Sequence, residues 1–477
     1  PTHKSRKDMV DASRRTTTLI AAATMGVYVL VMAGATTAIT DATAACSGWP
    51  TCGGHVLPTG GTELLIAWTH RAVALAVGVL VLVAGVAGMR ASEDRRVRAA
   101  LAFALLLYPV QVGLGALTAT QGPSTALSGL HLLAGVGIFA GFLVSLAWLL
   151  EGDDDAPIED PEPLGATTVE GAGDDADPYE PPTTTLGELV ETVRAYVTLT
   201  KPRLMWLLCL VAAAGMALAA GPDLSVRTVV ATLGGGVLAI GASGTFNHVL
   251  ERDVDRRMQR TSDRPLAADR VGVRNAVAFG VVLAVAAVLT FLSINVLAAV
   301  LGAVAIAYYS VVYTLLLKPN TVQNTVIGGL AGSFPAAIGA AAATNRIGLP
   351  ALLLAAVIFL WTPAHFYNLA LAYKEDYARG GFPMMPVVRG EATTRKHILL
   401  YLGATLIAAA ALAAVSGLGP LYSATSVVLG AAFLWTVVKL HRDPGERAAF
   451  RSFHAANAYL GAVLLAIVVD ALAVSPL

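Results

Sequence analysis

Long apolar stretches recur along this sequence and limit its possible folds more than any other feature. A stretch of about 20 mainly apolar residues can cross the roughly 30 Å hydrocarbon core of a bilayer as one helix. Of the 477 residues, 56% are hydrophobic and only 13% are charged, and the mean hydropathy is +0.67. Such values are typical of membrane proteins. Because a backbone in lipid must satisfy its own hydrogen bonds, we expect an all-α polytopic membrane protein.

The apolar stretches predict thirteen membrane-spanning helices. The first stretch is not followed by the small residues that form the cleavage site of a signal peptide, so we count it as a retained helix. The approximate bounds of the predicted spans are 17–39, 63–88, 97–119, 126–150, 203–220, 227–249, 274–294, 296–317, 322–343, 350–372, 397–416, 420–439 and 454–474.

An acidic stretch separates the first four predicted spans from the other nine. Residues 151–182 contain twelve acidic residues, no Lys or Arg, and many Pro and Gly. This composition cannot bury a core and predicts a disordered, solvated tether. We therefore expect a four-helix module at 1–150, an acidic disordered linker at 151–190 and a nine-helix module at 191–477.

Basic residues recur on alternate sides of the predicted spans. They precede span one and follow spans two, six, eight, ten and twelve, whereas the loops between are nearly uncharged. The positive-inside rule places the basic segments in the cytoplasm. We therefore predict a plasma-membrane protein with a cytoplasmic N-terminus and an exoplasmic C-terminus. The net charge of zero gives no indication of a nucleic-acid partner.

A densely charged segment, residues 247–265, directly follows the sixth predicted span. Asn247, Glu251 and Asp255 are four residues apart and would form one stripe of oxygen atoms on a helix. Four arginines lie close by in the sequence: Arg256, Arg257, Arg260 and Arg264. Carboxylate and amide oxygens suit a hard cation such as Mg²⁺, and Arg suits phosphate. Together they predict a magnesium–diphosphate site at the cytoplasmic face, the alternative being an ordinary positive-inside loop with compensating acids.

A second charged group on the same membrane face favours the metal–diphosphate interpretation. His365 lies near the inner end of the tenth predicted span, and Asp376 follows that span. Ionisable residues inside or at the rim of a membrane bundle are costly and often functional. Further cations predicted at this face are Lys201, Arg203 and Lys318.

The segment "NHVLERDVDRRMQRTSDRPL" resembles the first aspartate-rich motif, of the form NxxxDxxxD, of the UbiA-type intramembrane prenyltransferases. Together with "LTKPR", "YTLLLKPNTVQN" and "YKEDYARGGFPMMPVV", it looks like the branch of that family that farnesylates protohaem. The resemblance covers about residues 195–475 and implies a nine-helix UbiA-type bundle. It also implies that Mg²⁺ and cationic side chains assist the departure of diphosphate from farnesyl diphosphate. A vinyl group of haem B then attacks the allylic cation, and water quenches the product.

The resemblance assigns roles to the charged residues. Asn247, Glu251 and Asp255 would form the first Mg²⁺ site, and Asp376 would belong to the second. His365 would position haem or handle a proton, the alternative being a satisfied interior histidine. The candidate diphosphate ligands are Arg260, Arg264, Lys201, Arg203 and Lys318.

Two positions depart from the pattern of the wider family. Glu251 stands where the first motif has Asp, so its longer side chain changes the reach to a metal. Ala372 stands where the second motif, DxxxD, has its first Asp. The haem branch shares this second departure, which favours haem over a quinone or lipid acceptor.

The first four predicted spans carry a separate pattern. Cys46 and Cys52 lie in the outer loop between spans one and two, where the compartment permits a disulfide, two free thiols being the alternative. His70 and His131 lie at matched depth on the second and fourth predicted spans and could ligate one haem iron. Each histidine alone would more often be an interior residue.

The pieces "CSGWPTC", "THR", "PVQVGLGALT" and "LHLLAG", over about residues 16–150, resemble one half of the haem A synthase family. The catalytic Glu of that family falls on Ala67, so we do not expect haem A synthase activity from this module alone. Our hypothesis is that the module holds or passes haem. Candidate partners are haem A synthase, terminal-oxidase assembly factors or a second copy.

The main functional hypothesis is an enzyme that farnesylates haem B. One alternative is a UbiA-type prenyltransferase that acts on a quinone precursor or lipid. Another is a transporter of haem or another anion, for which we would expect inverted repeats and a charged site at the membrane midplane. The charges lie at one face instead, which favours the enzyme.

Overall fold

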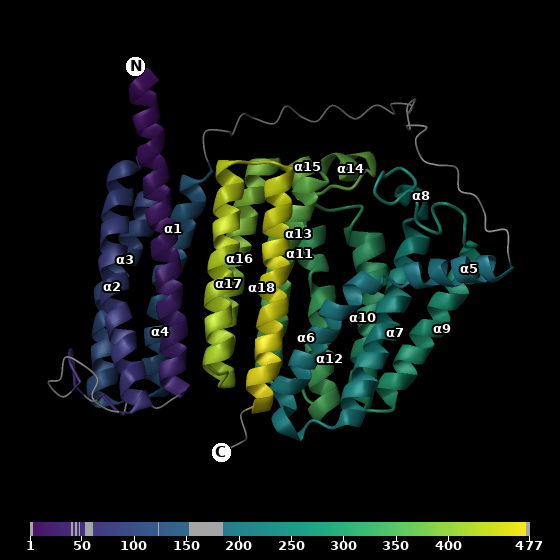
Figure 1. Cartoon of the computed structure of the whole chain (residues 1–477), viewed down its shortest axis with the longest axis horizontal. Coiled ribbons are helices and arrows are strands. Elements are labelled where there is room, and N and C mark those ends of the chain that lie inside the picture. The colour runs from purple at the N-terminus through teal and green to yellow at the C-terminus, as the bar shows by residue number, and fades with distance from the viewer. Residues whose placement is uncertain are drawn as a thin grey trace.

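The computed structural model is a bundle of long, nearly parallel and antiparallel helices (Figure 1). It describes residues 3–39, 42, 45–46, 48–52, 61–122, 124–151 and 185–473. Within these residues the regular secondary structure is helical, and thirteen helices are long and apolar enough to cross a membrane. The prediction of an all-α, multi-pass membrane protein is confirmed.

The observed spans lie within a few residues of the predicted ones. The spanning helices are α1 (His3–Ile39), α2 (Thr62–Ala91), α3 (Arg95–Gln121), α4 (Thr125–Leu149), α6 (Pro202–Ala220), α7 (Val226–Leu250), α9 (Val273–Leu292), α10 (Val296–Ala307) continued by the π-helical η2 (Tyr308–Leu317), α11 (Asn324–Gly328) with α12 (Leu330–Thr344), α13 (Leu349–Ala372), α16 (Glu391–Ser416), α17 (Pro420–Arg442) and α18 (Glu446–Ala473). The remaining elements are α5 (Thr185–Leu199), η1 (Gly221–Asp223), α8 (Arg252–Asp255), α14 (Lys374–Arg379) and α15 (Met385–Val388).

The helices α1 and α4 pack against α16 and α17, so the first four helices share a buried core with the later ones. The hydroxyls of Tyr28 and Ser426 are hydrogen-bonded at 2.7 Å inside this contact. Leu143 of α4 lies over Gly403 of α16, where any added Cβ would collide with the leucine. The predicted division into modules at 1–150 and 191–477 stays a prediction.

The predicted linker ends earlier than expected, because residues 185–190 form the beginning of α5. Apolar residues at Leu186, Val190, Val193 and Val197 recur at helical spacing, which favours an amphipathic helix over a disordered chain. The rest of the predicted linker, residues 152–184, lies outside the described residues.

The charged segments lie together at one end of the bundle. The beginning of α1, the end of α7, α8 and α14 are all at this end, whereas α18 ends at the opposite one (Figure 1). The helix α5 lies crosswise to the spans near the same end.

Small residues let two of the helices beneath this end approach closely. A Cβ added to Gly215 of α6 would collide with the carbonyl oxygen of Ala336, and one added to Gly339 of α12 would collide with that of Ala212. Such small-residue contacts are typical of membrane helices. They fix α6 against α12 directly below the charged residues.

Candidate active site

The acidic residues of the first motif lie where α7 ends. Asn247 is in the last turn of α7, Glu251 follows the helix, and Asp255 ends α8. They are only 2%, 5% and 3% exposed, respectively. Because buried carboxylates are costly unless they are paired, cationic partners are required here.

Two cations, one distant in sequence and one from the same charged segment, pair with the carboxylates. Lys318 Nζ lies 2.6 Å from Glu251 Oε1, and Arg264 Nη1 lies 2.9 Å from both oxygens of Asp255. Burial opposes ionisation of Glu251, but Lys318 and Lys201 outweigh it and hold the pKa of Glu251 below its usual value. At Asp255, burial outweighs the effect of Arg264 and raises the pKa.

Lys201 completes the cluster from the turn between α5 and α6. Its backbone is left-handed, with φ of 55°, and this turn directs the side chain towards α7. Its ammonium group donates to Asn247 Oδ1 and lies 3.4 Å from the hydroxyl of Tyr309. Burial lowers the pKa of Lys201 to about 7, although Glu251 favours its charged form. An additional anion at this position would favour the protonated lysine further.

The second motif is tied to the first by a main-chain contact. Asp376 is buried in α14, and its Oδ1 accepts hydrogen bonds from the Gln259 amide at 2.8 Å and from Arg379 at 2.9 Å. Gln259 follows Asp255 by four residues, so the two motifs are adjacent in space. Asp376 Oδ2 is buried and has no hydrogen-bond partner in the structure.

Arg260 lies at the exposed rim of this group. Its guanidinium is stacked over the rings of Tyr373 at 4.7 Å and Tyr377 at 5.4 Å, measured to the ring centroids. Its Nη2 also donates to the Tyr377 hydroxyl at 3.3 Å. The two aromatic rings therefore hold the guanidinium beside Asp376.

Two predicted site residues are not brought into the cluster. Arg203 is exposed in the first turn of α6 and makes no hydrogen bond or ion pair within the described part of the chain. His365 lies between α13 and α18, stacked between the rings of Trp361 at 4.2 Å and Phe453 at 4.4 Å. Its imidazole therefore faces α18 rather than the end of α7, and its predicted role stays a prediction.

Several residues of the site were not predicted from the sequence. His248 is buried with Nδ1 4.0 Å from Asp255 Oδ2, Thr314 accepts a hydrogen bond from Asn247 at 3.2 Å, and Lys318 Nζ lies 4.3 Å from the ring centroid of Phe382. The position of His248 next to Asn247 in the sequence is the one feature that could have predicted its place in the site. The π-helical geometry of η2 that brings Thr314 and Tyr309 to α7 has no comparable signature.

An apolar cavity of about 100 Å³ begins at Lys201 and Tyr309. It extends between α6, α7, α10 and α12, and its walls are mainly aliphatic. A ligand that joins an anionic group to a hydrocarbon chain would match the charged cluster and this cavity in turn.

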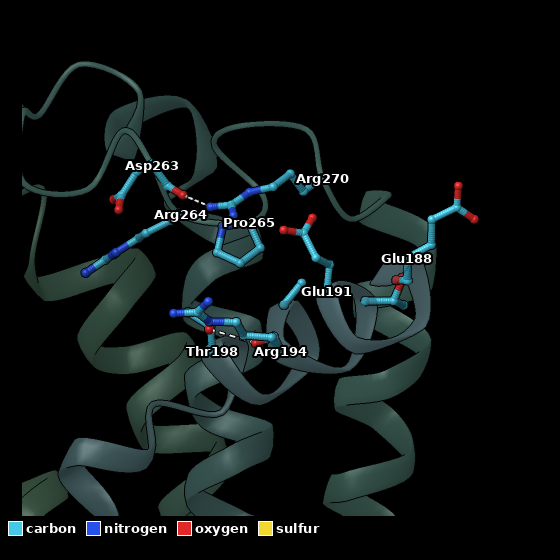
Figure 2. Close-up of a pocket in the computed structure, with 10 residues that line it drawn as sticks. Glu188, Glu191, Arg194, Thr198, Asp263, Arg264, Pro265 and Arg270 are labelled. Atoms are coloured by element: carbon cyan, nitrogen blue, oxygen red, sulfur yellow. Dashed lines mark hydrogen bonds between the residues drawn. The ribbon is translucent and has the colours of Figure 1, made fainter. Parts of the chain in front are cut away.

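A second cavity, of about 490 Å³, lies between α5 and residues 263–270 (Figure 2). We call it the surface cavity. Arg264 lines it and also binds Asp255. Arg264 therefore contacts both the surface cavity and the charged cluster.

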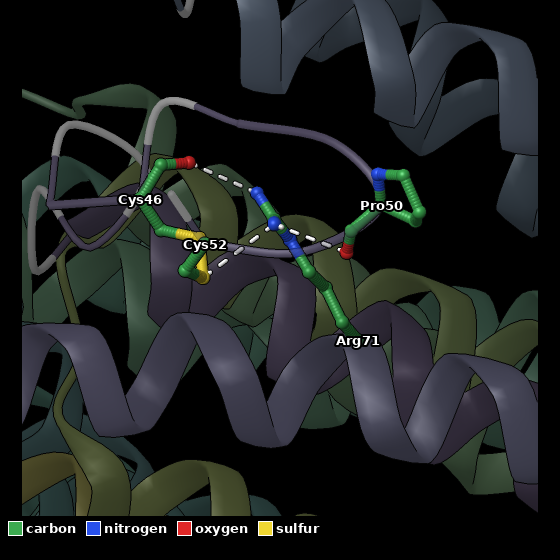
Figure 3. Close-up of a disulfide and its surroundings, with 4 residues drawn as sticks. All are labelled: Cys46, Pro50, Cys52 and Arg71. Carbon is green, nitrogen blue, oxygen red and sulfur yellow. Dashed lines mark hydrogen bonds between the residues drawn. A yellow bond between two sulfur atoms is a disulfide. The ribbon is translucent and has the colours of Figure 1, made fainter. Parts of the chain in front are cut away.

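The predicted pair of cysteines in the first outer loop forms a disulfide in the structure (Figure 3). The Cα atoms of Cys46 and Cys52 are 4.9 Å apart. Arg71 of α2 fixes the loop by donating hydrogen bonds to the main-chain oxygens of Cys46 at 2.9 Å and Pro50 at 3.4 Å.

The two predicted haem ligands are His70, one residue before Arg71 in α2, and His131, in the second turn of α4. His70 and His131 are partly buried, and the Nδ1 atom of each is buried without a hydrogen-bond partner among the residues that the structure describes. Both rings lie against glycine: Gly34 for His70 and Gly115 for His131. His131 Nε2 also lies 3.4 Å from the amide nitrogen of Gln111.

Comparisons with known proteins agree with this architecture. Residues 207–461 match the model of the UbiA prenyltransferase family. A relative from Haloarcula marismortui, named protoheme IX farnesyltransferase, is 61% identical over 97% of this chain and 99% of its own length. Protoheme IX farnesyltransferase 1 of Natronomonas pharaonis is 61% identical over 96% of this chain and 98% of its own.

A solved structure of a digeranylgeranylglyceryl phosphate synthase shares the fold, with a TM-score of 0.51 and 15% identity. It covers 60% of this chain and all of the other. Together, the helical bundle, the charged cluster at the end of α7 and the matching family model show that this chain belongs to the UbiA prenyltransferase family.

Proposed function

We propose that this prenyltransferase moves a farnesyl group from farnesyl diphosphate to a vinyl group of haem B, giving haem O and diphosphate. The observation that carries the proposal is the charged cluster: Lys201, Lys318 and Arg264 meet Asn247, Glu251 and Asp255 above an apolar cavity. The names of relatives at 61% identity point to the same reaction.

The cations of the cluster are suited to hold the leaving group. Lys318, Arg264 and Lys201 each bind an oxygen of the acidic stripe in this structure and can turn to diphosphate oxygens when substrate is bound. Their positive charge stabilises the negative charge that develops on diphosphate as the carbon–oxygen bond breaks. Arg260, which contacts two tyrosine rings, provides a further cation at the rim.

The oxygen-rich stripe fits Mg²⁺. Its donors are an amide and carboxylates, the hard ligands that this ion prefers, and Asp376 adds a buried oxygen without a partner. Asn247, Glu251, Asp255 and Asp376 are the residues that would hold the ion. A bound Mg²⁺ would neutralise part of the negative charge of the diphosphate.

The apolar cavity is suited to the prenyl chain and the allylic cation. Its aliphatic walls exclude water, and Tyr309 stands between them and the charged cluster. In the proposed reaction, the vinyl carbon of haem B forms a bond to the allylic carbon, and the cation left on the haem side chain accepts water. Loss of one proton from that water gives the hydroxyethylfarnesyl group.

We infer a plasma-membrane location with a cytoplasmic active site and N-terminus and an exoplasmic C-terminus. The beginning of α1 and the charged cluster lie at one end of the bundle, and α18 ends at the other (Figure 1). The basic loops of the sequence belong to the first of these ends, in keeping with the positive-inside rule.

We further propose that the first four helices form a module that binds haem B through His70 and His131. Two buried imidazole nitrogens without partners are available there as iron ligands. Gly34 and Gly115 leave the rings uncrowded. The module would hold haem or pass it on, with haem A synthase, oxidase assembly factors or a second copy as partners.

Acceptor competition in membranes tests the main proposal. Membranes containing the protein receive Mg²⁺, farnesyl diphosphate, haem B and 4-hydroxybenzoate, and the products are identified by mass. We expect a prenylated haem that is absent from the Asp255→Ala variant. Prenylation of 4-hydroxybenzoate alone would refute the haem assignment. Geranylgeranyl diphosphate in a parallel sample gives the chain-length preference.

The haem-binding module is tested by the absorbance of the purified protein after addition of haem B. We expect a low-spin spectrum in the wild type and its loss in the His70→Ala, His131→Ala double variant. A wild-type spectrum that persists in the double variant would contradict the proposed ligands.

A further inference from the structure

We propose that the surface cavity beside α5 binds the propionate carboxylates of the acceptor, with Arg194 and Arg270 as their partners. Because haem B is the acceptor only under the function proposed above, this role of the two arginines rests on that proposal. The cavity measures about 490 Å³ and is separate from the apolar cavity assigned to the prenyl chain.

The two arginines retain hydrogen-bond donors for an anion. The Arg194 guanidinium has no hydrogen bond or ion pair to any other described residue. Arg270 uses one nitrogen on the main-chain oxygen of Asp263. Figure 2 shows both guanidiniums extending to the same side of the cavity, with Pro265 between them in this view. The Glu191 carboxylate lies to one side of them, and the carboxylates of Glu188 and Asp263 point away. Arg binds carboxylates with two parallel hydrogen bonds, so each guanidinium is matched to one propionate.

The helix α5 places the cavity at the level of the lipid headgroups. Large apolar side chains are exposed along one face of the helix: Leu186, Leu189, Val190, Val193 and Val197. The cavity is lined by the rest of the helix surface, with Thr198 away from the apolar face and Arg194 at its edge, beside Val190 and Val197. A helix of this kind, lying crosswise to the spans (Figure 1), rests with its apolar face in the membrane interface. Haem is amphipathic in the same sense, with an apolar macrocycle and two carboxylates at one edge.

The cavity is fixed in place and connected to the reacting groups. Tyr196 of α5 packs edge-on against Phe279 of α9 at a centroid distance of 5.0 Å, and Leu199 is buried beside Leu266. Arg264 lines the cavity and binds Asp255 of the cluster at 2.9 Å. An acceptor held here by its carboxylates would therefore lie next to the site of diphosphate departure.

The test compares haem B with its dimethyl ester, in which both carboxylates are capped. We expect Arg194→Gln and Arg270→Gln each to raise the KM for haem B by about 10-fold or more. A change of this size corresponds to the loss of one hydrogen bond to a charged group. The KM for farnesyl diphosphate should not change. With the dimethyl ester, the wild type should already show the raised KM, and the substitutions should add little. Arg274→Gln, an exposed arginine of α9 outside the cavity, is the matched control and should leave both KM values unchanged.

Three results would overturn the assignment. An unchanged KM for haem B in both variants excludes the arginines as partners of the acceptor. Equal losses with haem B and with its ester show that the substitutions act on folding rather than on carboxylate binding. A wild type that prenylates no haem at all refutes the proposed function itself, and the acceptor site with it.

Discussion

Removing the Lys318 ammonium should leave Glu251 as a buried, incompletely paired carboxylate. The two side chains are only 13% and 7% exposed and meet at 2.6 Å. Breaking a buried pair by deleting one partner typically costs about 3–5 kcal/mol. Lys201 partly compensates at Glu251, so we expect Lys318→Met to fall at the lower end of this range. Prenyl transfer should also fall by at least about 10-fold, since one cation that holds the leaving group is lost.

A second substitution separates the two effects. Lys318→Met with Glu251→Gln removes both charges, so most of the lost stability should return, whereas activity should not. Lys374→Met is the control, because its pair with Glu391 is 41% and 45% exposed, and such pairs contribute about 0–1 kcal/mol. The assays are thermal unfolding of purified protein in detergent and product formation in membranes.

The reasoning would be refuted if the single and double variants unfolded at the same temperature. That result would mean that Glu251 carries no buried charge that Lys318 must neutralise. Recovery of activity in the double variant would instead exclude Lys318 as a cation for diphosphate.

Three further substitutions test other parts of the site and fold. Asp376→Asn still allows the hydrogen bonds to Gln259 and Arg379 but removes the negative charge of the carboxylate. We expect a lower kcat with unchanged thermal stability. An unchanged kcat would exclude Asp376 from the site. Arg260→Lys should raise the KM for farnesyl diphosphate nearly as much as Arg260→Met does, because a lysine cannot stack on Tyr373 and Tyr377 as a planar guanidinium can. A raised KM in the methionine variant alone would contradict this reasoning. Tyr28→Phe should lower the free energy of unfolding by about 1 kcal/mol with little effect on activity, since it removes a buried hydrogen bond to Ser426 far from the cluster. Unaltered thermal unfolding would show that this hydrogen bond between α1 and α17 does not stabilise the protein.

The spanning helices could be predicted from the sequence because each depends on local composition. An apolar run of sufficient length has few alternatives in a bilayer, and the thirteen predicted spans correspond to thirteen observed ones. The helix α5 was not predicted, because the acidic composition before it dominated the interpretation. Its apolar residues at helical spacing, Leu186 to Val197, were the available signal.

The candidate site could be predicted where the contacts follow helical spacing. Asn247, Glu251 and Asp255 were found from their four-residue spacing, although Glu251 and Asp255 lie beyond the end of α7. The partner of Glu251 could not be predicted, because Lys318 lies 67 residues away and their pairing depends on how η2 packs against α7. His365 shows the opposite limit: its position in the second half of α13 could be predicted from the sequence, but the face of α13 that it occupies is set by packing against α18.

The mass of the haem recovered from membranes in water enriched in oxygen-18 tests the central claim most directly. Membranes containing the protein, Mg²⁺, haem B and farnesyl diphosphate should yield haem that has gained one farnesyl group and one hydroxyl group carrying oxygen-18. The Glu251→Gln, Asp255→Asn double variant should yield unmodified haem. Unmodified haem from the wild type, with farnesyl diphosphate consumed only when another acceptor is supplied, would contradict the assignment of haem as the acceptor.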